Sequence, residues 1–148
     1  MIYYTSSVKE TDELAARLAR QITNGCFIAF RGDLGAGKTA FVSALAAALG
    51  STAQTSSPTF ALLNQYTDGR LPVYHFDLYR IEGREIYDLG FDEMFFDAHS
   101  VRCVEWSERL EEQDMPGQRL DINIIKLDGD NRCFVITPIG YKEGEFDI

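Results

Sequence analysis

The spacing of hydrophobic positions changes several times along the chain, and each change marks a predicted helix or strand. Apolar side chains recur three and four residues apart between Leu14 and Ile22, which is the spacing of an amphipathic helix. Ser7-Val8-Lys9-Glu10 matches a capping box before this stretch, and Asn24-Gly25 is a stop signal after it. We therefore predict a helix between the two signals, with a short edge strand over residues 2–4 before it.

Short apolar or alternating runs predict the strands. The unbroken run from Cys26 to Phe30 is typical of a buried strand, and the Ala- and Leu-rich stretch from Ala40 to Leu49, ended by Gly50, is typical of a helix. Further strands are predicted at 61–66, 73–77, 100–106, 119–127 and 132–137. The last two alternate apolar and polar residues on either side of Asp128-Gly129 and predict an antiparallel hairpin with one buried face.

These elements predict a single α/β domain over residues 1–148. We expect three layers and a mixed sheet that the C-terminal hairpin extends in antiparallel fashion. A short acidic helix is predicted over residues 107–113, and residues 140–148 are expected to form a mobile tail.

Residues 32–39 read Gly-Asp-Leu-Gly-Ala-Gly-Lys-Thr and match G-x-x-x-x-G-K-S/T, the phosphate-binding loop. The match lies between a predicted strand and a predicted helix, which is the context that this motif requires. Its glycines let the backbone curve around an anion, and the helix N-terminus directs positive dipoles at phosphates. Lys38 can reach the outer phosphates and the Thr39 hydroxyl can bind Mg²⁺. The sequence thus favours a P-loop NTPase fold over a chance glycine-rich turn.

Two carboxylates follow predicted strands and are candidates for the metal. Asp77 ends the strand at 73–77, where an acid can bind Mg²⁺ opposite the loop hydroxyl. Glu105 ends the strand at 100–106, and open parallel sheets bind ligands beyond the carboxyl ends of their strands. Solvated acids at strand ends are the alternative for both. Trp106 is expected near a nucleotide or in the core, and His75, on the strand face of Asp77, is interpreted as a packing residue.

Three other stretches leave two interpretations open. Ser57-Pro58-Thr59-Phe60 can be a nucleotide-sensing loop or a Pro-containing turn. Glu10-Thr11 stands at a helix start, where capping is the favoured role and ligand contact the alternative. The acidic and aromatic stretch 78–97 can be a surface for a protein partner or a satellite of the core.

Composition narrows the class of protein. The formal net charge is −9, with 23 acidic and 14 basic residues, which argues against direct binding of nucleic acid. No apolar run has the length of a membrane span, and the N-terminus lacks the features of a signal peptide, so we expect a cytoplasmic protein. The 3 cysteines fit no metal site and are expected to be buried, inert thiols.

Taken together, the motifs closely resemble those of the bacterial TsaE family, also known as YjeE. The resemblance covers residues from about 5 to about 110 and rests on Glu10-Thr11, the loop at 32–39, Ser-Pro-Thr-Phe at 57–60, His-Phe-Asp-Leu-Tyr-Arg at 75–80 and Glu-Trp at 105–106. It implies a small ATPase that uses ATP, ADP and Mg²⁺. It also implies TsaD and TsaB as partners in forming threonylcarbamoyladenosine at position 37 of tRNAs that read ANN codons, with the tRNA held by those partners.

The resemblance implies roles for particular residues. It makes Lys38, Asp77 and Glu105 the catalytic set, with Thr39, Asp77 and Glu105 on the metal. The residues implied to contact the nucleotide are Thr11, Asp33, Leu34, Gly35, Ala36, Gly37, Lys38, Thr39, Ala40, Thr59 and Trp106. Two positions depart from the family pattern, because Ala40 lacks the hydroxyl that often follows the motif Thr and Ser107 replaces the usual Pro after Glu-Trp.

Two other functions remain open on sequence grounds. A small-molecule kinase needs a second substrate pocket and usually an Arg-bearing lid, and the chain shows only scattered arginines in this region. A nucleotide-dependent scaffold would signal through its bound state without significant turnover. A GTPase is disfavoured because N-K-x-D is absent and the one D-x-x-G, Asp114 to Gly117, follows a predicted helix.

Overall fold

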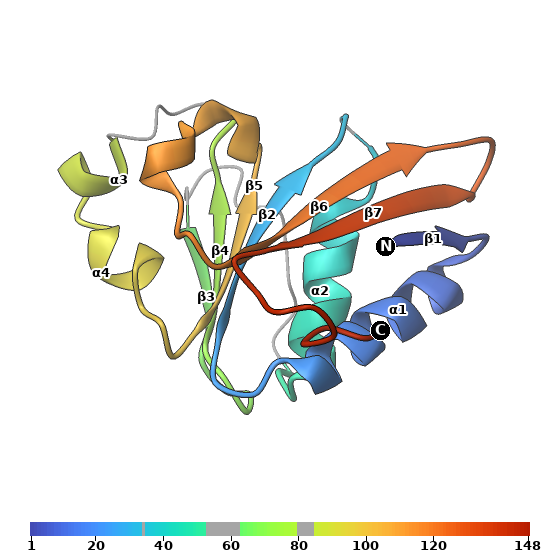
Figure 1. Ribbon diagram of the computed structural model, residues 1–148, viewed down its shortest axis with the longest axis horizontal. Helices are drawn as coiled ribbons and strands as arrows, with labels where there is room; N and C mark the ends of the chain where they lie inside the picture. The colour runs from blue at the N-terminus through green and yellow to red at the C-terminus, as the bar shows by residue number, and fades with distance from the viewer. Residues whose placement is uncertain (34, 53–62, 80–84) are drawn as a thin grey trace.

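A seven-stranded mixed sheet organises the molecule, in the computed structural model that describes residues 1–33, 35–52, 63–79 and 85–148 (Figure 1). Its strand order is β1-β7-β6-β2-β5-β4-β3. The strands are β1 (Ile2–Thr5), β2 (Cys26–Arg31), β3 (Leu63–Tyr66), β4 (Val73–Asp77), β5 (Val101–Glu105), β6 (Arg119–Lys126) and β7 (Arg132–Ile139). The central strands β6, β2, β5 and β4 are parallel to one another, and β1, β7 and β3 pair antiparallel at the edges.

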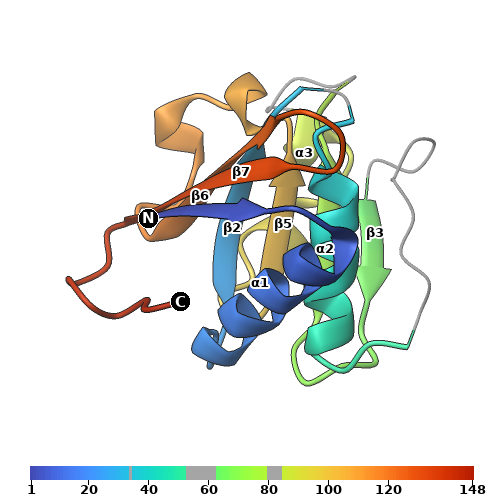
Figure 2. The ribbon, with the colours of Figure 1, turned by 90° about the vertical axis from the view of Figure 1, so that its right-hand side faces the viewer.

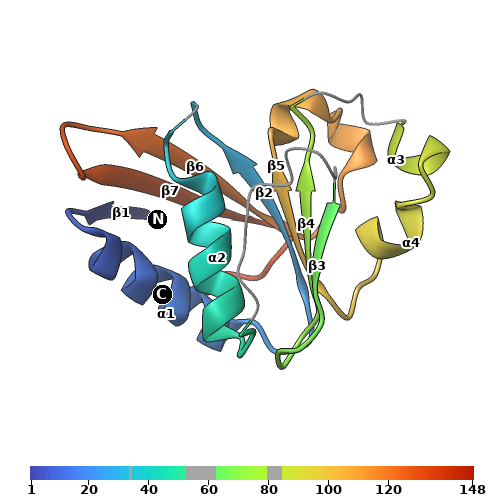
Figure 3. The same ribbon diagram turned by 180° about the vertical axis from the view of Figure 1, so that it is seen from behind.

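Helices cover both faces of the sheet (Figures 2 and 3). The long helices α1 (Val8–Gln21) and α2 (Lys38–Ala48) lie side by side on one face, and the short helices α3 (Glu85–Asp88) and α4 (Asp92–Phe95) lie on the other. The predicted three-layer α/β fold, with a mixed sheet and the antiparallel β6–β7 hairpin, is therefore confirmed.

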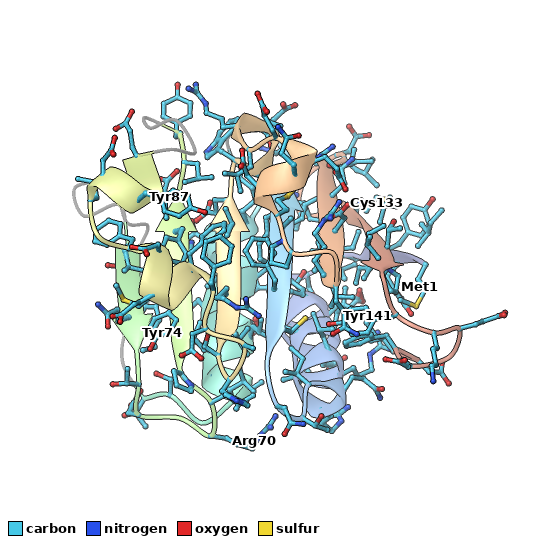
Figure 4. All side chains as sticks on the ribbon, turned by 60° about the vertical axis from the view of Figure 1, so that its left-hand side comes forward. Met1, Arg70, Tyr74, Tyr87, Cys133 and Tyr141 are labelled. Carbon is cyan, nitrogen blue, oxygen red and sulfur yellow. The ribbon has the colours of Figure 1, made fainter. Side chains whose placement is uncertain are left out.

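The two faces bury different sets of side chains because residues alternate along each strand. Ile28 and Phe30 of β2 pack with Cys103 of β5 beneath α1 and α2. Phe27 of β2 packs edge to face against Phe95 of α4 on the opposite side, with ring centroids 5.1 Å apart. Figure 4 looks onto this second face, where Tyr74 of β4 and Tyr87 of α3 lie. β2 and β5 are thus buried on both faces, as the unbroken apolar run of β2 predicts, whereas β6 alternates buried with half-buried or exposed residues from Leu120 to Ile125.

Helix ends follow the predicted signals. The Ser7 hydroxyl accepts the Glu10 amide at 3.2 Å, and the Glu10 carboxylate accepts the Ser6 amide at 2.7 Å, which completes the cap of α1. Gly50 follows α2 at φ 97°, in the left-handed region that favours glycine.

The predicted helix over 107–113 is wrong, because the segment forms two separate 3₁₀ turns, Ser107–Arg109 and Glu112–Asp114. Leu110 adopts an extended conformation between them and buries its side chain.

Within residues 140–148, for which the sequence predicts a mobile tail, three side chains pack against the core and residues 142–145 are exposed; the segment runs back toward α1 (Figure 1). Tyr141, Phe146 and Ile148 contact the core cluster under α1, and the Tyr3 hydroxyl donates to the Ile148 carbonyl at 2.9 Å.

All three cysteines are buried and free, as predicted, and burial raises the pKa of Cys26 to about 11. In the described ranges, no helix combines the length and the apolar character that crossing a membrane requires.

Candidate functional site

The glycine loop joins the end of β2 to the first turn of α2, and two of its glycines are required by the backbone. Gly32 has φ 148°, and a Cβ there would lie 2.6 Å from the Ile124 carbonyl oxygen of β6. Gly37 has φ 107° and immediately precedes α2. Within the loop, the Ala36 amide donates to the Asp33 carbonyl at 3.0 Å. The loop therefore turns closely over the sheet and leads directly into the helix N-terminus.

Lys38 is the first residue of α2 and is folded back onto the loop. Its ammonium donates to the Gly32 carbonyl and lies 3.6 Å from the centroid of the Trp106 ring. Burial lowers the pKa of Lys38, and the surrounding carboxylates act in the opposite direction; these belong to Glu105, Glu108, Asp77 and Asp33. The Lys38 ammonium is thus surrounded by carboxylates, and its direct contacts are the Gly32 carbonyl and the face of the Trp106 ring.

Thr39 and Glu105 form a polar contact between α2 and the sheet. The Thr39 hydroxyl donates to Glu105 Oε2 at 3.0 Å, and Oε1 lies 3.3 Å away. Glu105 is only 4% exposed although it carries a carboxylate. His75 of β4 contacts Oε2 from the other side through Nε2. A polar chain therefore runs from α2 through β5 to β4 on the face that α1 and α2 cover.

Asp77 ends β4 directly beside Glu105, its partner in the parallel register. Paired residues of parallel strands point to the same face, so both carboxylates stand on the side of α2. The Asp77 carboxylate accepts the Tyr79 amide at 2.9 Å and is half-buried. The structure thus brings both predicted acids to one sheet edge. Of the two, Glu105 is the acid that accepts the Thr39 hydroxyl.

Trp106 follows Glu105 with φ 60°, in the left-handed region that bulky side chains rarely adopt. Its ring packs against Tyr79, with centroids 4.9 Å apart and planes inclined by 50°. This conformation turns the ring beneath Lys38, and its cost is of the order of 1–3 kcal/mol. Backbone strain of this kind is typical of functional sites.

A pocket opens beside the loop, between the start of α1 and the tip of the β6–β7 hairpin. Its lining residues are Ser7, Val8, Thr11, Asp12, Ala36, Gly37, Ala40, Asp130, Arg132 and Phe134. Four of these were predicted to contact a ligand, and the Thr11 hydroxyl is hydrogen-bonded to that of Thr5 at 2.9 Å. Residues that the sequence predicts as ligand contacts therefore line one wall of this pocket.

Arg132 belongs to the opposite wall and was missed. Its Nε donates to the Ala36 carbonyl of the glycine loop at 3.0 Å, which ties the hairpin to the loop. One terminal nitrogen donates to the Gly129 carbonyl at 2.9 Å within the hairpin turn. The sequence signals the turn through Asp128-Gly129, but nothing in it indicates which segment the turn approaches.

The donor set suits Mg²⁺ that arrives with a phosphorylated ligand. Thr39 offers a hydroxyl oxygen, and Glu105 and Asp77 offer carboxylates at one sheet edge. Across the described part of the chain, no group of three or more His, Cys, Asp or Glu forms a closed metal site. Mg²⁺ is commonly held by one or two carboxylates together with water and substrate phosphates, so this arrangement fits it. Leu34 and Thr59, with the loop at 57–60, lie outside the described residues.

Fold and site together define the class: a three-layer α/β protein whose glycine loop faces carboxylates at the ends of neighbouring parallel strands. The chain belongs to the family described as "Threonylcarbamoyl adenosine biosynthesis protein TsaE", whose sequence model matches residues 5–134. The predicted resemblance to this family is confirmed.

Individual relatives agree with this assignment. The chain is 42% identical over 138 residues to the tRNA threonylcarbamoyladenosine biosynthesis protein TsaE of Bacillus subtilis, covering 93% of this chain and 85% of that protein. It is 39% identical to the protein of the same name from Synechocystis, covering 74% and 72% respectively. The crystal structure of Bacillus subtilis YdiB is similar with a TM-score of 0.77 and 34% identity, covering 95% of this chain and 86% of that one.

Proposed function

We propose that this protein binds ATP with Mg²⁺ at the glycine loop and hydrolyses it in support of tRNA threonylcarbamoyladenosine biosynthesis. The observation that carries the proposal is the contact between the Thr39 hydroxyl and the Glu105 carboxylate at 3.0 Å, at the end of the glycine loop. A hydroxyl that donates its proton to a carboxylate keeps its oxygen lone pairs for a cation. The curated relatives, named as tRNA threonylcarbamoyladenosine biosynthesis proteins, supply the biological context.

Different residues would bind the phosphates and the nucleoside of ATP. Backbone amides at the start of α2 donate to the phosphates, and Lys38 exchanges the Gly32 carbonyl and the Trp106 ring for an outer phosphate. The pocket between Thr11 and Arg132 accommodates the sugar and base. Its walls come from α1, the glycine loop and the hairpin, so ligand binding would join three segments that are distant in sequence.

For hydrolysis, bound Mg²⁺ would neutralise charge on the phosphates. Thr39, Glu105 and Asp77 are the residues that would hold it. A carboxylate that does not ligate the metal directly is placed to orient a water molecule. We assign these two tasks to Glu105 and Asp77 as a pair, because they are neighbours in register at the same sheet edge.

TsaD and TsaB are the proposed protein partners, in the cytoplasm, and they rather than this chain would hold the tRNA. The net charge of −9 supports this division, because phosphate backbones are bound by clustered Lys and Arg. ATP hydrolysis is then expected to depend on, or be stimulated by, the partner proteins.

The test is phosphate release from ATP by the purified chain, alone and with TsaD and TsaB. Release that appears or increases with the partners supports the ATPase. Steady turnover that requires a small-molecule acceptor would instead identify a kinase. Tight nucleotide binding without turnover in either condition would identify a nucleotide-dependent scaffold. Lys38→Ala serves as the matched control, since it removes the loop cation.

A further inference from the structure

His75 contacts Glu105 of the candidate site, and the proposed binding and hydrolysis of ATP assign it no task. The residue lies in the middle of β4 and is 0% exposed. Its Nε2 is in hydrogen-bonding contact with Glu105 Oε2, the same oxygen that accepts the Thr39 hydroxyl at 3.0 Å. Glu105 is therefore held between a hydroxyl on α2 and an imidazole on β4.

The direction of this hydrogen bond follows from its partners. A carboxylate oxygen accepts but carries no hydrogen, so the proton lies on Nε2 of His75 and is donated to Glu105. Nδ1 of His75 is buried and has no hydrogen-bond partner among the described residues. The tautomer with its proton on Nδ1 would bury an unpaired N–H and set two lone pairs against each other. The surroundings thus select one tautomer.

We propose that His75 is the positioning residue for Glu105. By donating to Oε2 it fixes the carboxylate over Thr39, where α2 meets β5 next to the glycine loop. Residues that orient metal-binding groups from behind commonly change metal affinity when they are replaced, by about 10- to 100-fold. The inference rests on the proposed function, because the purpose of the fixed carboxylate is the magnesium-nucleotide site.

A purely packing role predicts different behaviour. In that case any side chain of similar volume would serve, and the damage would appear as lost stability alone. A positioning role requires a donor at the place of Nε2. His75→Gln can return an amide N–H to that place, whereas His75→Leu fills the space without a donor. Val73→Ala is the matched control, since Val73 is buried on the same strand face as a member of the apolar core cluster.

The first test measures the Mg²⁺ concentration needed for tight binding of a non-hydrolysable ATP analogue, by calorimetry. We expect His75→Leu to raise this concentration about 10- to 100-fold, with binding in EDTA unchanged. His75→Gln should recover most of the loss, and Val73→Ala should keep the wild-type requirement. A requirement in His75→Leu no higher than in Val73→Ala would overturn the proposal. If the wild-type protein shows no Mg²⁺-dependent binding, the proposed function fails instead.

The second test requires no nucleotide and no substitution of His75, so it does not depend on whether the His75 variants fold. The chain has 2 histidines, His75 and the exposed His99, so ¹⁵N-labelled histidine gives an assignable ring spectrum, with His99→Asn to confirm the assignment. We expect His75 to carry its proton on Nε2 and to exchange it slowly with water. Glu105→Ala should accelerate that exchange. A proton on Nδ1, or exchange that Glu105→Ala leaves unchanged, would overturn the proposal.

Discussion

The Lys38 ammonium lies 3.6 Å from the centroid of the Trp106 ring, and Trp106 is the only tryptophan in the chain. The cation that should meet the phosphates therefore rests on the one side chain that dominates the protein's fluorescence. Because a ring and a cation attract each other through the ring's quadrupole, moving Lys38 changes the environment of the indole.

Fluorescence of Trp106 should accordingly report nucleotide binding. Addition of ATP or ADP with Mg²⁺ is expected to change its intensity or emission maximum, as Lys38 transfers from the ring to a phosphate. In Lys38→Ala the starting spectrum should already differ from that of the wild type. The expectation fails if saturating nucleotide, verified by calorimetry, leaves the wild-type spectrum unchanged.

Gly32→Ala should destabilise the fold and distort the loop. A Cβ at this position meets the Ile124 carbonyl oxygen at 2.6 Å, in addition to the strain of φ 148°, which is of the order of 1–3 kcal/mol. Gly144→Ala is the control, with φ 83° but open space around the added atom, and should cost only about 1 kcal/mol. Urea unfolding measures both, and equal losses would contradict the close approach of the loop to β6.

Arg132→Met should weaken nucleotide binding by about tenfold, since a hydrogen bond from a charged donor to the Ala36 carbonyl is lost. Lys126→Met is the control, because Lys126 pairs with Arg132 in the hairpin register but is exposed. It removes the same charge from the same end of the hairpin. Calorimetric titration with ADP compares the two, and equal losses of affinity would show a general electrostatic effect instead.

Asp68 should make stability depend on pH. Hydrogen bonds from the Ser51 hydroxyl and from the amide and hydroxyl of Thr52 lower the pKa of Asp68 from 3.8 to about 2. A pKa that is lower in the folded state gives stability that is complete above pH 4 and is lost as the pH falls toward 2. Asp68→Ala should therefore be less stable than the wild type at pH 7, and the difference should shrink below pH 4. A difference that stays constant down to pH 3 would refute this assignment.

Local patterns predicted most of the fold. The apolar run before residue 32 and the glycine motif after it fix β2, the loop and α2, because each depends on neighbouring residues only. Asp77 and Glu105 could be placed together because the carboxyl ends of parallel strands meet at one sheet edge. Both inferences needed no knowledge of how distant segments pack.

The parts that the sequence did not predict are contacts between distant segments. Alternation placed His75 on the face of Asp77, but it could not show that its Nε2 meets Glu105, 30 residues away. Arg132 reaches Ala36 across 96 residues because the hairpin bends toward the loop. The packing of Tyr141 likewise depends on the Cys26 region, which lies far from it in sequence. Such contacts leave no periodic signal.

The central claim is that Glu105, which is hydrogen-bonded to Thr39, takes part in hydrolysis of a nucleotide bound by the glycine loop. Single-turnover hydrolysis of ATP by Glu105→Ala, with TsaD and TsaB present and with ATP affinity measured in parallel, tests it most directly. We predict that hydrolysis slows by about 100-fold or more while affinity falls by much less. Hydrolysis by Glu105→Ala at the wild-type rate would contradict the claim.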